Sequence, residues 1–206
     1  MRFIDPDGMR IDDYFNWQGK YLGSDGAKTD YVQIISQRDW DRNKIVDKEG
    51  NESISHDAGA YESDNIAKVS LSDNAVENIV KHYDSQVDGV DRNARTQIKS
   101  EQLSNKNTLM QSQKGGQQEI FGITIKDPDP KIVVNTQDGK VHSELNTASN
   151  IKNTLVHELD HQVAPTMSTP QLELRAIDAQ RNHSTYSGTT SSYKKLIDNY
   201  EKYYKK

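Results

Sequence analysis

The chain has 206 residues, which suits one domain of ordinary size, or a domain of about 130 to 150 residues with an N-terminal appendage. Its 31 acidic and 26 basic residues give a formal net charge of -5 and are spread evenly. Because no basic stripe is available to neutralise phosphates, nucleic acid is not expected as a partner. There is no cysteine, which excludes disulfides and thiolate metal sites and leaves His, Asp and Glu as metal ligands.

Apolar runs are short throughout the sequence. Apolar residues make up 33% of the chain, and the longest runs, within 31–36 and 131–135, hold only a few residues. A helix that spans a bilayer needs roughly 20 apolar residues, so no membrane span is expected. The N-terminus has no apolar segment of the kind that forms a leader, and we therefore expect no signal peptide.

Residues 1–40 have the pattern of a small hairpin unit. The run Asp-Pro-Asp-Gly at 5–8 forms turns readily, and aromatic and polar residues then alternate up to a second turn at Gly19. The segment 31–35 has the composition of a strand. The following residues, 41–65, are mostly Asp, Asn, Ser, Glu and Gly, which predicts a polar linker.

The remaining residues, 66–206, are expected to form the main domain. Apolar residues at three- and four-residue spacing predict helices at about 72–88, 146–163, 169–182 and 193–204. Two apolar stretches, 119–125 and 131–135, predict a pair of strands joined by a proline-containing turn. Residues 91–118 are polar, and their scattered apolar residues are compatible with one or two short helices.

The pentapeptide HELDH lies in the second half of the expected helix 146–163. His157 and His161 are four residues apart, so their imidazoles project from the same helical face and can bind one metal ion. Glu158 follows the first histidine directly and can lean over the open side of the metal as a general base. A zinc ion with three protein ligands keeps one position for water and lowers the pKa of that water towards about 7. The motif therefore predicts zinc-dependent hydrolysis, foremost of a peptide bond.

The third metal ligand has to come from outside the pentapeptide. Glu173 is the preferred candidate because it lies in the first turn of the next expected helix, after a short proline-containing connection. Ala176, three residues further on, is small and would let the two helices pack closely. Among competing carboxylates, Asp160 points away from the histidine face, and Asp178 is better placed to accept a hydrogen bond from a ligand imidazole.

These residues resemble the motif of the zincin metallopeptidases, and in particular of the gluzincin branch, whose third ligand is a glutamate in a Glu-x-x-Ala context, here Glu173 to Ala176. The resemblance covers roughly 120–183. It implies an α+β fold, mostly helical, with a small antiparallel or mixed sheet beside the metal-binding helix. It also implies a strand that runs along the cleft and pairs with the substrate backbone, for which 119–125 and 131–135 are both candidates.

Members of this family use a His or Tyr to stabilise the oxyanion of the tetrahedral intermediate. His183 and Tyr186 follow the glutamate-bearing helix and are the candidates for that role. One departure from the family is that the gap between His161 and Glu173 is shorter than in its best-known large members. The size of the substrate cleft is therefore not implied by the resemblance.

The opening segment resembles the junction of RHS-type polymorphic toxins and wall-associated proteins of Bacteroidetes, in which an Asp-Pro-Asp-Gly turn ends the repeat shell. The resemblance covers the first 25 to 35 residues. It implies that the chain is the C-terminal effector of a larger exported polypeptide, delivered to another cell by the missing part. A protein target in or on a competing cell and an immunity protein would then be its partners.

Two other functions remain open at this point. A catalytically silent binding or spacer domain would keep the helices without stoichiometric zinc. A zinc amidase would use the same chemistry on a cell-wall bond. A further hypothesis is that residues 37–65 cover the cleft, with His56 or Asp57 at the open metal position.

Overall fold

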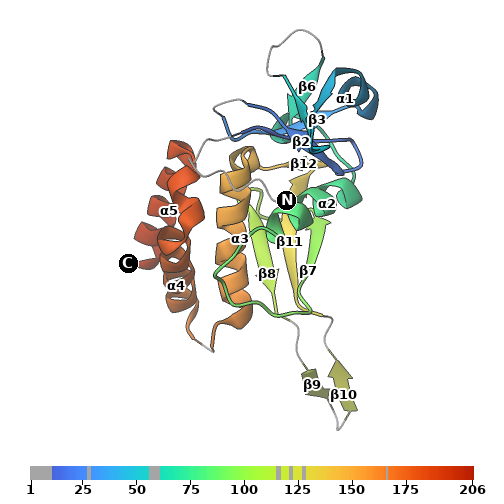
Figure 1. Ribbon diagram of the computed structural model, residues 1–206. Helices are drawn as coiled ribbons and strands as arrows, with labels where there is room; N and C mark the ends of the chain where they lie inside the picture. Colours follow the sequence, from blue (N-terminus) through green and yellow to red (C-terminus); the bar gives the residue numbers. More distant parts are fainter. Residues whose placement is uncertain are drawn as a thin grey trace.

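The computed structural model describes residues 11–26, 29–55, 61–114, 117–120, 123–126, 129–165 and 167–206. These residues form two mixed sheets, a two-stranded hairpin and five α-helices, which confirms the expected α+β class (Figure 1). No helix among them has the length and apolar character needed to cross a bilayer.

The first sheet is formed by the N-terminal part of the chain (top of Figure 1). Its strand order is β4 (Lys44–Val46), β5 (Glu52–Ile54), β2 (Tyr21–Ser24), β1 (Asp13–Phe15), β3 (Val32–Ile35) and β6 (Ser63–Asn65). The antiparallel pairing of β1 with β2 confirms the expected hairpin, and β3 confirms the strand expected at 31–35. Helix α1 (Gln37–Asn43) follows β3 and buries Trp40 against a small cluster of its own with Tyr14, Ile35 and Ile54.

The segment 41–65 differs from the polar linker that its composition predicts. Three strands of the first sheet come from it: β4 and β5 pair with each other, and β6 pairs with β3. Ile45 and Val46 are each 54% exposed, and Ile54 is the buried apolar residue of β5. Strands this short, with so few buried side chains, leave no apolar alternation for sequence reasoning to detect. The division of the chain into domains stays a prediction.

The second sheet is built around one central strand. β11 (Lys131–Gln137) pairs in parallel with β7 (Gln97–Glu101) and antiparallel with β8 (Met110–Gln113) and β12 (Lys140–Val141). β9 (Gln117–Ile120) and β10 (Ile123–Lys126) form a separate antiparallel hairpin.

One expectation about this region is wrong, and one question that the sequence leaves open is answered. The stretches 119–125 and 131–135 do not pair with each other, because the described part of 119–125 belongs to the β9–β10 hairpin whereas β11 pairs with β7, β8 and β12. Residues 91–118, for which the sequence is also compatible with one or two short helices, contain β7, β8 and the first two residues of β9. In β7 the buried residues alternate, with Ile98 and Ser100 buried between more exposed neighbours, as in a strand with one face on the core.

The helices lie close to where their apolar periodicity predicts them. They are α2 (Asp73–Asp84), α3 (Ala148–Val163), α4 (Thr169–Asn182) and α5 (Ser191–Tyr204). Short 3₁₀ turns occur at Ile66–Lys68, Ser143–Leu145 and Ser184–Gly188. The expected end of α2 is four residues too late. Ser72 caps this helix by accepting a hydrogen bond from the Ala75 N–H, as its position predicts.

The helices position the functional residues by packing around α3. In Figure 1, α3 lies between β8 on one side and the α4–α5 pair on the other, in agreement with the contacts between these elements. The main core joins α2, α3 and the second sheet, and it reaches the first sheet through Phe15, Val32 and Ile34. The hairpin turn at Gly19 packs on the first turn of α2, where a Cβ atom would overlap the Ala75 carbonyl oxygen.

Candidate active site

Helix α3 carries the pentapeptide HELDH, and contacts at its N-terminus and on its core-facing side fix the orientation of the helix. Thr147 caps the helix by accepting a hydrogen bond from the Asn150 N–H at 3.2 Å. Ile151, Leu155 and Leu159 face the main core and are at most 2% exposed. The 3.6-residue period then leaves the two histidines of the last turns on the side that faces α4.

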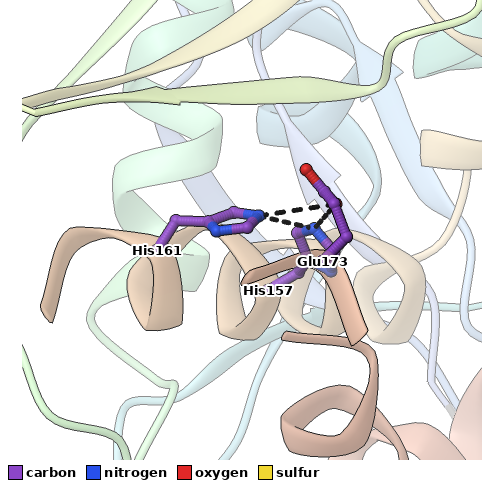
Figure 2. Close-up of side chains that lie close together, drawn as sticks. All are labelled: His157, His161 and Glu173. Carbon is purple, nitrogen blue, oxygen red and sulfur yellow. Dashed lines mark hydrogen bonds and ion pairs between the residues drawn. The ribbon is translucent and has the colours of Figure 1, made fainter. Parts of the chain in front are cut away.

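Three side chains converge at this point, as the sequence predicts (Figure 2). The Nε2 atoms of His157 and His161 are 3.0 Å apart. The Oε2 atom of Glu173, on α4, lies 3.2 Å from the first of them and 3.6 Å from the second. The chain thus folds back through residues 164–168 to bring the expected third ligand onto the histidine pair.

This arrangement fits a tetrahedral metal ion. Zinc binds imidazole nitrogen and carboxylate oxygen at about 2.0 to 2.2 Å, so two of its ligand atoms lie about 3.3 Å apart. The three observed separations, 3.0, 3.2 and 3.6 Å, bracket that value. Two imidazoles and one carboxylate are also a donor set used by catalytic zinc ions, which keep one position open.

A hydrogen-bond network fixes the tautomer of His157. Gln180 donates its amide N–H groups to the Tyr193 hydroxyl at 2.9 Å and to the Asn153 carbonyl at 3.3 Å. Its amide oxygen therefore faces the His157 ring, at 3.0 Å from Nδ1. Because an amide oxygen can only accept, Nδ1 carries a proton, and Nε2, on the side of Glu173 and His161, is the nitrogen available to bind a metal ion.

Gln180 takes the place that the sequence assigns to Asp178 as acceptor for a ligand imidazole. Asp178 is exposed, on another face of α4. Gln180 lies seven residues after Glu173, which is two helical turns and therefore the same face. That spacing is a signal in the sequence that identifies Gln180, whereas Asp178, five residues after Glu173, lies on a different face of the helix.

Glu173 is positioned by contacts at the start of α4. Ser168 and Gln171 form a capping box at its N-terminus. Two residues after the glutamate, Arg175 forms an ion pair with Asp160 of α3 at 3.0 Å, which confirms that Asp160 does not join the metal group. Ala176 is fully buried, as expected for a small residue between two closely packed helices.

The charge of the His157, His161 and Glu173 group favours the binding of a cation. Burial acts to raise the pKa of Glu173, but its contacts with His157 and His161 outweigh burial and lower the pKa to about 2. Burial likewise acts to lower the pKa of His157, and the nearby carboxylates of Glu173 and Glu158 raise it on balance. The carboxylate of Glu173 is therefore ionised throughout the neutral range and supplies negative charge where a metal would bind.

Glu158 lies beside the group without joining it. The side chain is 6% exposed, and its Oε2 atom accepts a hydrogen bond of 2.6 Å from the Ser112 N–H of strand β8. Burial raises the pKa of Glu158, and the histidines oppose that shift. Within the described part of the chain, the Ser112 N–H is the donor that holds Oε2, and Oε1 accepts no hydrogen bond and is available for proton transfer.

A cavity of about 410 Å³ opens at these residues. Its floor is α3, with His157, Glu158 and His161. One wall consists of β8 and the residues before it, and the opposite wall consists of α4 and α5. Its volume lies within the range of small-ligand and peptide side-chain pockets.

The strand that lines this cavity is β8, whereas 131–135, one of the two stretches that the sequence suggests, does not line it; the side chains of the other stretch, 119–125, lie outside those described. Met110, Gln111 and Ser112 line the cavity, whereas no described residue of β11 does. Gln162 of α3 clamps the strand by donating to the Ser112 hydroxyl and to the Gln113 carbonyl. The polar sequence of β8 gave no signal for a strand, so only the fold reveals its position.

The structure does not bring His183 and Tyr186 to the cavity. His183 contacts the Asp88 carbonyl at 2.7 Å through Nε2 and the Thr185 hydroxyl at 2.9 Å through Nδ1. The ring of Tyr186 lies under the Lys194 ammonium, 5.4 Å from its centroid. The 3₁₀ turn after α4 directs both residues away, and among the described residues that line the cavity neither is present.

The described residues of 37–65 do not cover the cleft. None of them lines the cavity, and they belong to α1 and the first sheet instead. His56 and Asp57, the candidates for the open metal position, lie outside the described residues.

A His-His-Glu group at the base of a cavity in an α+β fold has the features of a metal-dependent hydrolase. The chain belongs to the family described as Metallopeptidase toxin 2, whose profile matches residues 13–205. A search of curated proteins found no match, and a search of solved structures found none either. Membership implies a metal ion, peptidase activity on a protein substrate and a toxin that acts on other cells.

Proposed function

We propose that this chain is a zinc-dependent peptidase in which His157, His161 and Glu173 bind the metal and Glu158 is the general base. The observation that carries the proposal is the convergence of three ligand atoms within 3.0 to 3.6 Å of one another, beside a buried carboxylate that is not a ligand. The family assignment supports peptide hydrolysis over other reactions of the same chemistry.

Zinc is the metal that this donor set favours. The chain has no cysteine, and two neutral imidazoles with one carboxylate suit zinc better than the hard cations that prefer all-oxygen sites. When bound, the ion would lower the pKa of a water molecule and polarise the scissile carbonyl. The protonated Nδ1 of His157, held by Gln180, keeps the ligand nitrogen free of a proton.

In this proposal Glu158 accepts a proton and later donates it. Its Oε2 atom is held by the Ser112 N–H, so Oε1 takes the proton from the attacking water and returns it to the leaving amine. Burial raises the pKa of this carboxyl, which makes the carboxylate a stronger base than an exposed glutamate.

Two further elements complete the site. Strand β8 pairs with β11 and lines the cavity, so its other edge is placed to pair with an extended substrate backbone. For the oxyanion, Tyr200 of α5 replaces the two residues that the sequence suggests, since it lines the cavity. Burial raises the pKa of Tyr200, and so do the charges of Glu173 and Glu158, which keeps its hydroxyl protonated and able to donate.

The toxin assignment supports delivery of this domain as the C-terminal effector of a larger exported polypeptide, with an immunity protein that protects the producing cell. The resemblance of the first 25 to 35 residues to an RHS junction supports the same route. The described part of that segment is the β1–β2 hairpin and β3.

The test is hydrolysis of fluorescein-labelled casein by the zinc-loaded chain. We expect release of labelled peptides, loss of activity with the chelator 1,10-phenanthroline, and recovery when zinc is added back. Glu158→Gln serves as the matched control, because glutamine keeps the hydrogen bond from Ser112 but cannot take the proton. Equal hydrolysis by the parent and by Glu158→Gln would refute the proposed mechanism.

A further inference from the structure

The cavity has one wall without charged side chains, and this wall lies next to the metal group. Every residue that α5 contributes to the cavity is apolar or aromatic: Tyr193, Leu196, Ile197, Tyr200 and Tyr204. The adjoining part of α4 contributes Leu172, directly before the ligand Glu173, and Ile177, one turn later. We call Leu172, Ile177, Leu196, Ile197 and Tyr204 the apolar wall.

The two acidic residues of α5 form ion pairs outside the cavity. Asp198 and Glu201 form ion pairs with Arg181 at 2.7 and 2.8 Å, and Lys205 pairs with Glu201 at 2.5 Å. None of these residues lines the cavity. The helix is thus amphipathic, with its apolar side turned towards the metal group rather than completely covered by protein.

Part of the apolar wall belongs to the core and part remains accessible. Ile177 and Ile197 are at most 5% exposed and form the base of the wall. Leu172 and Leu196 are only partly buried although they are large and apolar. Apolar side chains that line a cavity beside polar functional groups are typical of a site that binds an apolar group of a ligand.

We infer that the apolar wall receives a large apolar side chain of the substrate, such as Leu, Met, Ile or Phe, from a residue next to the scissile bond. The inference rests on the proposed function, because the adjacency of Leu172 to Glu173 places the wall beside the bond that is cleaved. A carboxylate or ammonium group in this position would lose its hydration and find no opposite charge on the wall. The preference is expected to exceed about tenfold over small or charged residues, as for hydrophobic pockets that differ by a methylene or more.

The experiment uses a tryptic digest of a bacterial proteome as a peptide mixture. The zinc-loaded parent and Glu158→Gln are incubated with it, and the new termini are identified by mass spectrometry. We expect termini specific to the parent, with large apolar residues enriched at one position next to the cut. Termini specific to the parent without such enrichment would overturn the inference and leave the proposed function standing.

Leu196→Arg tests the wall itself. We expect the preferred residue at that position to change from apolar to acidic, because the guanidinium would supply the missing opposite charge. Asn199→Arg, which adds the same charge at an exposed position of α5 outside the cavity, should leave the preference unchanged.

If Leu196→Arg does not fold, Leu196→Ala gives a second test. The smaller side chain enlarges the pocket, and we expect the preferred substrate residue to shift towards Phe and Tyr. An unchanged preference in a folded Leu196 variant would overturn the inference.

A binding measurement tests the preference of the apolar wall for apolar residues without catalysis. Glu158→Gln is titrated calorimetrically with two peptides that are identical except for a central Leu or Asp. We expect the Leu peptide to bind at least about tenfold more tightly, and the difference to disappear in Glu158→Gln/Leu196→Arg. Equal affinities would overturn the inference. If the parent produces no new termini in the proteome digest beyond those of Glu158→Gln, the proposed function fails. The affinities of the Leu and Asp peptides then test by themselves whether the apolar wall selects apolar residues.

Discussion

The first sheet and the region around α3 contribute differently to the site. All described residues that line the cavity fall between Asn105 and Tyr204, and the first sheet contributes none of them. The loop that leads into β3 of this sheet instead holds the opposite end of α3: the Asp30 carbonyl and carboxylate accept the N–H groups of Ala148 and Ser149 at 2.9 and 2.8 Å. The region around α3 therefore carries the residues proposed for metal binding and catalysis, and the first sheet and its loops stabilise the helix on which they lie.

If this division is correct, substitutions near the metal should change activity with little loss of stability, and substitutions in the first sheet should do the reverse. The largest effect is expected for Glu158→Gln. Its kcat/KM should fall about 10²- to 10⁴-fold, the usual contribution of a general base. Zinc content and the midpoint of thermal unfolding should stay close to those of the parent, because glutamine still accepts the Ser112 N–H.

The next largest effect is expected in the first sheet. Trp40 is fully buried, and its indole N–H donates to the Glu52 carboxylate at 3.1 Å. Trp40→Ala should lower the free energy of unfolding by about 3 to 5 kcal/mol, measured by denaturant titration. Trp17→Ala, at a position 43% exposed, should change it by less than about 0.5 kcal/mol. A loss of zinc affinity in folded Trp40→Ala would show that the two regions are not separable.

A smaller effect is expected for the residue that orients His157. Gln180→Leu removes the acceptor of the Nδ1 proton and should weaken zinc binding about 10- to 100-fold in a competition assay with a chelating dye. Tyr193→Phe removes a neighbouring bond of the same network without touching the imidazole and should cost far less affinity. Asp178→Asn should have no effect. An equal weakening by Asp178→Asn would return Asp178 to the role that the sequence suggests.

The smallest effect is a pH dependence in the first sheet. Burial raises the pKa of Asp13 to about 6, although the Tyr83 hydroxyl donates to its carboxylate at 2.9 Å. Because the folded pKa lies above the ordinary value of 3.8, this group contributes stability that is complete below about pH 4 and is lost as the pH rises through about 6. The contribution should be about 1 to 2 kcal/mol, since the side chain is partly exposed.

Asp13→Asn should remove this dependence and leave the parent less stable than the variant at pH 7. The measurement is denaturant unfolding of both proteins between pH 4 and 8. A parent whose stability relative to the variant rises through this range would contradict the assignment.

The site could be predicted from the sequence because its residues are close in the chain and obey helical geometry. His157 and His161 are placed by their spacing alone, and Glu173 by its position at the start of the following helix. Gln180 shares a face with Glu173 and was within reach of the same argument. His183 and Tyr186 were misplaced because the direction of a turn after a helix depends on what that turn packs against, which spacing does not encode.

The part of the first sheet that residues 44–65 form, and β8, lie beyond such reasoning for a different reason. Their strands are three or four residues long, and their partners are distant in sequence, as in the pairing of β2 with β5. In β8, Met110 is buried on one face while Ser112 contacts Glu158, so the functional role of the strand is carried by a backbone N–H that has no sequence signature. Tertiary contacts decide both structures.

The most direct test of the account is the metal content of three purified chains, measured by plasma mass spectrometry after dialysis against zinc and then against buffer. We predict about one zinc per chain in the parent and in Glu158→Gln, and none in His157→Ala. This outcome would separate the ligand from the base at adjacent positions of one helix. Absence of zinc from all three chains, or equal zinc in all three, would contradict the central claim that His157, His161 and Glu173 form the metal site.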